Sequence, residues 1–203
     1  MTMSPTKPNR KALFAEGGPV PAGGVCLSSF VVLRSGPKIL VGKMARPEIW
    51  VDRFFVGEQY APNYASSGKL LIPGSHLAWY ESPEDAARRV LKEQVMLPLA
   101  ERNAVRLKEV QSHMGGDPSS ETEPPHWDIC FVYETNVLAK SARKLASPEW
   151  FEGFGFVPAA KLKADDFTRG HGDVLEQAGV IGLSKKRKST RRRRALTKPK
   201  RRK

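Results

Sequence analysis

The sequence has no long hydrophobic run, and this bears on where the protein resides. No window among its 203 residues reaches the roughly 18 apolar residues that a membrane-spanning helix needs. The basic residues near the N-terminus are not followed by the apolar segment of a secretory signal peptide. We therefore expect a soluble intracellular protein, cytoplasmic or, in a eukaryotic source, nuclear.

Cysteine is scarce, and histidine is scattered. Cys26 and Cys130 lie far apart in apolar segments, without the spacing of metal ligands, so we expect buried thiols in a reducing compartment. His113, His126 and His171 form no ligand-spaced cluster, and no GxSxG motif is present. The sequence thus gives no support for a histidine-held metal or a serine nucleophile.

Acidic residues are absent from residues 185–203, which hold 13 of the 34 lysines and arginines. The rest of the chain carries 21 bases and 21 acids, so this segment accounts for the net charge of +13. Because like charges repel, residues 184–203 are predicted to form a disordered tail. Binding to RNA or DNA phosphates is our first expectation, and a nuclear-import signal, an anionic membrane surface or a solubilising tail are alternatives. The residues expected to contact nucleic acid are Lys185, Lys186, Arg187, Lys188, Arg191, Arg192, Arg193 and Arg194.

The remaining residues suit one domain, because 40% of the chain is hydrophobic. Residues 1–22, rich in Pro, Gly, Ser and Lys, are predicted to be a flexible leader, and residues 23–183 the domain. Apolar and β-branched runs predict strands over 25–34, 38–43, 104–114, 126–138 and near 150–158, and a short strand in KLLIPG. Residues 47–68 are predicted to be a strand followed by a long loop. The order of elements predicts an α+β fold with a mixed sheet and packed helices.

A helix with a well-defined start is predicted after Ser82. Ser82 is a favourable N-cap, Pro83 suits the first helical position, and acids follow in the first turn. Pro98 disfavours helical geometry at Leu97 and so predicts the end of the helix. The apolar residues at helical spacing, which predict a packed face, are Ala87, Val90, Leu91 and Val95. A second helix is predicted around HGDVLEQ.

Residues 72–97, IPGSHLAWYESPEDAARRVLKEQVML, resemble the Nudix box, G-x5-E-x7-R-E-U-x-E-E-x-G-U with U apolar. The alignment needs no gap, and the resemblance extends over about residues 23–183. It implies a Nudix-type α/β/α sandwich. The positions that match the common form of the box are Pro73, Gly74, His76, Leu77, Glu81, Ser82, Pro83, Glu84, Ala86, Ala87, Arg88, Arg89, Leu91, Glu93 and Leu97. Gly74, Glu81, Arg89 and Leu91 are expected to form the scaffold of the box.

The departures from the box fall on its acids and glycines. Val90 stands where the pattern has the Glu after Arg, and Gln94 where it has the second Glu of the pair. Ser75, Tyr80 and Met96 stand where family members have glycine, and Ala78 where they often have Glu. Two of the three helix acids are therefore replaced.

The resemblance implies Mg²⁺ or Mn²⁺ held by box carboxylates against a diphosphate. Glu93 is the remaining helix acid, and it is either a ligand or an ordinary helix residue. Glu134 matches the place of an additional acidic ligand in many Nudix proteins, with a surface carboxylate as the alternative. Glu121 and Glu123 lie in a loop that can reach the site, although we expect them to be solvated.

Arg89 is expected to orient box carboxylates, by pairing with Glu81 or Glu93, and His76 to touch phosphate or stabilise its turn. Two functions follow from the resemblance. The first is hydrolysis of a nucleoside-diphosphate-linked substrate, with Glu93 and Arg89 as catalytic residues and a weakened or altered metal site. The second is an inactive Nudix-fold module that binds a nucleotide or RNA and is tethered to nucleic acid by its tail.

Overall fold

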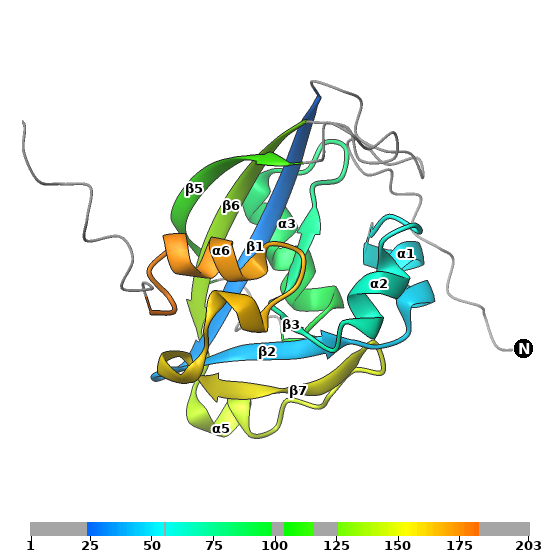
Figure 1. Cartoon of the computed structure of the whole chain (residues 1–203). Helices are drawn as coiled ribbons and strands as arrows, with labels where there is room; N and C mark the ends of the chain where they lie inside the picture. Colours follow the sequence, from blue (N-terminus) through cyan, green and yellow to red (C-terminus); the bar gives the residue numbers. More distant parts are fainter. Residues whose placement is uncertain (1–23, 55, 99–103, 116–125, 183–203) are drawn as a thin grey trace, which may run out of the picture.

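The computed structural model describes residues 24–54, 56–98, 104–115 and 126–182. These residues form a seven-stranded sheet with helices on both faces (Figure 1). The strands are β1 (Val25–Ser35), β2 (Lys38–Met44), β3 (Leu70–Leu71), β4 (Gly74–His76), β5 (Arg106–Gly115), β6 (His126–Asn136) and β7 (Phe151–Pro158). The helices are α1 (Pro47–Phe54), α2 (Ala61–Ser66), α3 (Pro83–Glu93), α5 (Ala139–Ala142) and α6 (His171–Gln177), with 3₁₀ turns η1 (Ala159–Lys161) and η2 (Ala164–Asp166).

The sheet is mixed, as the sequence predicts. Its strand order is β3-β2-β1-β6-β5, with β4 also paired to β1 and β7 to β2. β1 runs parallel to β6, and the other pairs are antiparallel. The predicted strands over 25–34, 38–43, 104–114, 126–138 and near 150–158 are all confirmed, and so is the tight turn between the first two.

Alternation along β1 and β6 divides the core between the two sheet faces. Val31 and Tyr133 pack with Val90 and Leu91 of α3 on one face. Residues on the other face, including Phe30 of β1, pack against α6. This alternation confirms the two-sided sandwich, with the box helix and the C-terminal helix on opposite faces of the sheet (Figure 1).

The prediction of a strand and a long loop over residues 47–68 is wrong, because the short helices α1 and α2 occupy this region. Trp50 and Phe54 are one helical turn apart, are buried, and pack edge to face with ring centroids 5.2 Å apart. Trp150 and Phe151 from the distant strand region complete the cluster. Contacts made over a long sequence separation therefore overrule the strand preference of these aromatic residues.

The two cysteines are buried free thiols on neighbouring strands, as expected. Burial, with a smaller contribution from the charge of Asp128, raises the pKa of each thiol to about 12. Both thiols are therefore uncharged at neutral pH. No helix among the described residues has the length and apolar character needed to cross a bilayer.

Candidate functional site: the box region

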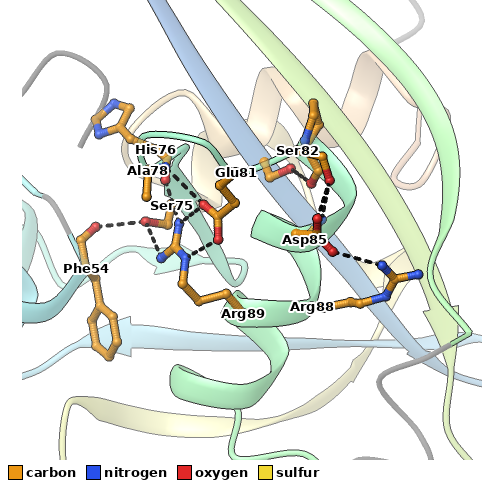
Figure 2. A network of polar contacts seen from close by, with 11 residues as sticks. Phe54, Ser75, His76, Ala78, Glu81, Ser82, Asp85, Arg88 and Arg89 are labelled. Carbon is orange, nitrogen blue, oxygen red and sulfur yellow. Dashed lines mark hydrogen bonds and ion pairs between the residues drawn. The ribbon is translucent and has the colours of Figure 1, made fainter. Parts of the chain in front are cut away.

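Helix α3 begins as its sequence predicts. The Ser82 hydroxyl accepts a hydrogen bond from the Asp85 amide at 3.1 Å and so caps the helix. Arg88 pairs with Asp85 on the exposed side of the first turns (Figure 2). It also pairs with Glu84. The helix ends at Glu93, earlier than the expected end at Leu97, with Gln94 as its C-cap. The chain then turns back, and the Leu97 amide donates to the Leu91 carbonyl at 2.9 Å.

Two non-glycine residues, one shortly before α3 and one shortly after it, have a left-handed backbone conformation. Tyr80 has φ 59° and Met96 has φ 58°, and both stand where family members carry glycine. The Glu81 amide donates to the Ala78 carbonyl across the turn that contains Tyr80. The backbone of the box is thus kept although its glycines are lost, at a cost in strain for each L-residue.

We expect Tyr80→Gly and Met96→Gly each to raise the free energy of unfolding by about 0.5–1 kcal/mol. Glycine relieves the left-handed strain, and its greater entropy in the unfolded chain offsets part of that gain. Both side chains are exposed, at 103% and 62%, so little packing is lost. Urea denaturation measures the change. Leu138→Gly is the control, since Leu138 is also exposed but has φ −64°, and it should lower stability.

Arg89 joins the helix to the loop that precedes it (Figure 2). Its Nε and Nη2 donate to the two carboxylate oxygens of Glu81 at 2.7 and 2.8 Å, a bidentate geometry. Nη2 also donates to the His76 carbonyl at 2.8 Å. The side chains are only 6% and 13% exposed. Of the two partners that the sequence offered, the structure thus shows a direct ion pair with Glu81, and its geometry makes Arg89 a structural tie.

Val90 is part of the core. It is 1% exposed and packs with Leu91, Val31 and Tyr133 between α3 and the sheet. The expectation that it joins the packed face of the helix is confirmed. An aliphatic side chain offers no donor atom to a hard cation, and this one has no access to solvent.

The Gln94 side chain is hydrogen-bonded to Gly74, in the loop that precedes α3. Its Oε1 accepts a hydrogen bond from the Gly74 amide at 3.0 Å, and its Nε2 donates to the Gly74 carbonyl at 2.9 Å. The Gln94 backbone carbonyl accepts from Trp150 Nε1 at 3.0 Å. The side chain is 1% exposed. We call this double hydrogen bond the Gln94 clamp, because it fixes the end of the helix to the start of the loop.

Gly74 is placed where no side chain fits. A Cβ added there would lie 2.5 Å from a ring atom of Phe30, closer than real Cβ contacts come. Next to it, Ser75 stands in the box's opening glycine position and donates to the Phe54 carbonyl at 3.1 Å (Figure 2). The loop is thus anchored to α1 as well as to α3. His76 contributes its carbonyl to Arg89, and its contact with a phosphate stays a prediction.

The two predicted metal ligands lie on different parts of the fold. Glu93 is half-buried on the last turn of α3 and has polar contacts within the protein. Glu134 accepts from Arg34 Nε at 2.7 Å and lies 3.7 Å from Lys108 Nζ. It alternates with Tyr133 and so points to the sheet face opposite α3.

The electrostatics of Glu134 are those of a paired carboxylate. Burial raises the pKa of the Glu134 carboxyl, but the hydrogen bond from Arg34 and the charges of Arg34, Lys108 and Arg106 more than offset it. The pKa therefore lies below its ordinary value. The structure does not bring Glu93 and Glu134 together on one sheet face, and their role as joint ligands stays a prediction.

The residues present do not fit a box-held Mg²⁺ or Mn²⁺. Within the described ranges, no three acidic, histidine or cysteine side chains are grouped so as to hold a metal ion. Val90 has no atom that could coordinate a metal ion. The side-chain oxygen of Gln94, Oε1, already accepts a hydrogen bond from the Gly74 amide. Glu121, Glu123 and the basic tail lie outside the described residues.

The comparisons with known proteins agree with this fold. A family model described as NUDIX domain matches residues 38–178. The chain belongs to the NUDIX domain family. No curated protein matches it.

Solved structures of the same fold come from several organisms. A MutT protein from Methanosarcina mazei is 13% identical, with a TM-score of 0.50 over 77% of this chain and 94% of that one. The dihydroneopterin triphosphate pyrophosphohydrolase of E. coli is 10% identical, with a TM-score of 0.50 over 74% and 92%. At these identities the likeness shows the fold alone.

Sequence reasoning missed a pair of covered polar groups near the start of α6. Arg169 Nη1 and His171 Nε2 are fully covered and have no hydrogen-bond partner in the structure. The sequence patterns singled out neither residue for binding, since His171 belongs to no ligand-spaced cluster and Arg169 to no motif. What distinguishes both residues is burial, which only the fold reveals.

His171 is expected to make stability depend on pH. Burial, with the charge of Arg169, lowers the pKa of its imidazole well below the ordinary value. Below about pH 6.5 the unfolded chain therefore binds a proton that the folded chain does not, so stability falls as the pH falls. The contribution is about 1.4 kcal/mol per pH unit while only the unfolded state is protonated. Urea denaturation at several pH values between about 5 and 7 measures it.

His171→Asn is the matched variant for this pH dependence. The imidazole Nδ1 accepts from the Ile72 amide at 3.0 Å, and the asparagine carbonyl keeps an acceptor there. Asparagine does not titrate, so the slope of stability against pH should be smaller in this variant. An unchanged slope would mean that another group is responsible.

Proposed function

We propose that this NUDIX-domain protein binds a diphosphate-linked, nucleotide-type ligand without hydrolysing it through a metal held by the box helix. The Gln94 clamp is the observation that carries the proposal. A side chain that satisfies both polar groups of Gly74 is structural, and releasing it would leave two buried backbone groups without partners. The ligand class rests on the family and on the likeness to the E. coli dihydroneopterin triphosphate pyrophosphohydrolase, whose substrate is a triphosphate.

The second position supports the same proposal. Val90 is packed against the sheet, so the helix keeps its fold-determining contacts where the family pattern has an acid. The Arg89–Glu81 ion pair joins the helix to the loop that precedes it. These contacts support a scaffold role for the box.

The alternative is a hydrolase with an altered metal site, in which Glu93 is the one acid left at the three metal-ligand positions of the box helix. The observation that favours it is that Glu93 is half-buried rather than packed in the core, at the end of α3. In that case substrate phosphates would have to supply most of the ligands of Mg²⁺ or Mn²⁺.

The experiment that separates the two functions is a panel of nucleoside diphosphate derivatives, assayed for binding by calorimetry and for turnover with Mg²⁺ or Mn²⁺. Saturable binding without turnover supports the proposal. Turnover that Glu93→Gln abolishes would establish the hydrolase. Glu84→Gln, which changes an exposed acid of the same helix, is the control for loss of charge.

We also propose that residues 184–203 attach the protein to RNA or DNA. Residues 1–184 are electrically balanced, whereas residues 185–203 carry the whole charge excess without an aromatic residue to stack on bases. Binding should therefore weaken steeply with salt and show no sequence preference. Deleting residues 184–203 should abolish the salt-sensitive binding in a mobility-shift assay. If the shortened chain binds as well as the full chain, the tail is not the attachment site.

A further inference from the structure

Arg169 carries a charge that the described part of the protein does not neutralise. Its guanidinium makes no ion pair or hydrogen bond within the described ranges, and its Nη1 is fully covered. The face of the Tyr64 ring lies near it, with the ring centroid 5.6 Å from the guanidinium carbon. Arginine stays protonated in proteins, so a charged N–H group, Nη1, lies covered here without an acceptor. Covering it costs folding free energy unless an anion completes the arrangement.

His171 adds a second donor without an acceptor. Because its Nδ1 accepts from the Ile72 amide, the proton of the neutral ring is on Nε2. That Nε2–H is fully covered and has no partner. The ring is fixed edge to face against Phe30, with centroids 4.9 Å apart, so it cannot turn towards solvent without breaking both contacts. Arg169 is close enough for its charge to affect the imidazole.

Among the described residues, the groups whose charges act on Arg169 are Tyr64 and Cys26, and neither is a carboxylate. Cys26 is an uncharged thiol because burial raises its pKa to about 12. Arg169 itself has φ 56° and is followed by Gly170 with φ 67°. A non-glycine residue in the left-handed region is strained, and such strain is found preferentially at functional sites.

We propose that Arg169 and His171 bind an oxyanion, a phosphate or carboxylate group of a small ligand. A planar guanidinium fork and an imidazole N–H are donors suited to such a group, and its charge would balance that of the arginine. The pair lies against Phe30, on the α6 face of the sheet, and is thus separate from the box helix on the other face. The proposal holds whether or not the box binds a nucleotide.

The test uses the full chain with inorganic phosphate and acetate as probes, in separate titrations at constant ionic strength with chloride. The readout is the imidazole NMR resonances of His171, one of four histidines, identified by their loss in His171→Asn. This local readout is not affected by phosphate that binds the basic tail. One of the two anions should shift these resonances saturably, and the stronger one identifies the group.

Arg169→Met is the deciding variant, because methionine keeps much of the side-chain volume without charge or donors. It should weaken binding by about tenfold or more, in line with the loss of charge-assisted hydrogen bonds. It should also raise the unfolding midpoint in the absence of anion, since a partly buried charge without an ion-pair partner among the described residues is removed. Arg143→Met, at an exposed arginine, controls for loss of one positive charge.

Two results would overturn the proposal. One is that neither anion shifts the His171 resonances of the native chain at millimolar concentration. The other is that Arg169→Met binds as tightly as Arg143→Met. A lower unfolding midpoint for Arg169→Met would show that the arginine stabilises the fold. This result would also contradict the proposal that its charge lacks a partner until an anion binds.

Discussion

Replacing Glu81 with alanine is expected to lower the free energy of unfolding by about 3–5 kcal/mol, the cost of leaving a buried charge without its partner. Arg89 would lose its bidentate partner, although it would keep its contacts with the His76 carbonyl and the Ser75 hydroxyl. The Ala78 amide, which donates to Glu81 Oε2 at 3.0 Å, would also lose its acceptor. Urea denaturation followed by circular dichroism measures the loss.

The matched control for this prediction is Glu84→Ala. Glu84 also pairs with an arginine, Arg88, but their side chains are 48% and 38% exposed. An exposed pair contributes about 1 kcal/mol or less, because water solvates both charges after the change. If Glu81→Ala costs no more than Glu84→Ala, the ion pair between Arg89 and Glu81 does not hold the box loop in place.

Local chemistry explains which parts of the fold can be predicted from the sequence. Ser82 and Pro83 define the start of α3 because a cap and a fixed φ act within one turn. Gly36, with φ 59°, lies in the tight turn between β1 and β2, and the apolar runs on either side form these strands. Neither feature depends on distant contacts.

The helices α1 and α2 were missed for the opposite reason. Trp50 donates to the Trp150 carbonyl at 2.8 Å, across a separation of 100 residues. A segment stabilised from so far away carries few local signs of its conformation, and its aromatic residues favour a strand by propensity. The same limit applies to Arg169 and His171, whose missing partners become evident only once the sheet, α2 and α6 are assembled.

Within the box, too, local contacts could be predicted from the sequence and distant contacts could not. Packing of Val90 follows from its helical spacing with Ala87, three residues earlier, so its burial was predictable. The role of Gln94 could not be predicted, because the sequence alone shows only a neutral amide that would be a weak metal ligand. Its partner, Gly74, is 20 residues away and lies beside it only after the loop has folded over α3.

Gln94 gives the second large effect that we expect. Gln94→Met keeps a similar volume but leaves the Gly74 amide and carbonyl without partners, which should cost about 2–4 kcal/mol of unfolding free energy. Gln94→Glu, which introduces the acid of the family pattern, should cost about 3 kcal/mol or more at neutral pH. A buried carboxylate would then face the Gly74 carbonyl where Nε2 now donates at 2.9 Å.

The response of Gln94→Glu to Mg²⁺ distinguishes a clamp from a metal site. With Val90 in the core, the new carboxylate has no second box acid at that position to share a cation with. Mg²⁺ should therefore leave the unfolding midpoint of the variant unchanged, as in the native chain. Lower pH should recover part of the loss, because protonation removes the buried charge and restores a donor towards Gly74. Recovery by Mg²⁺ at neutral pH would instead mean that the box keeps the geometry of a metal site, and that Gln94 alone had closed it.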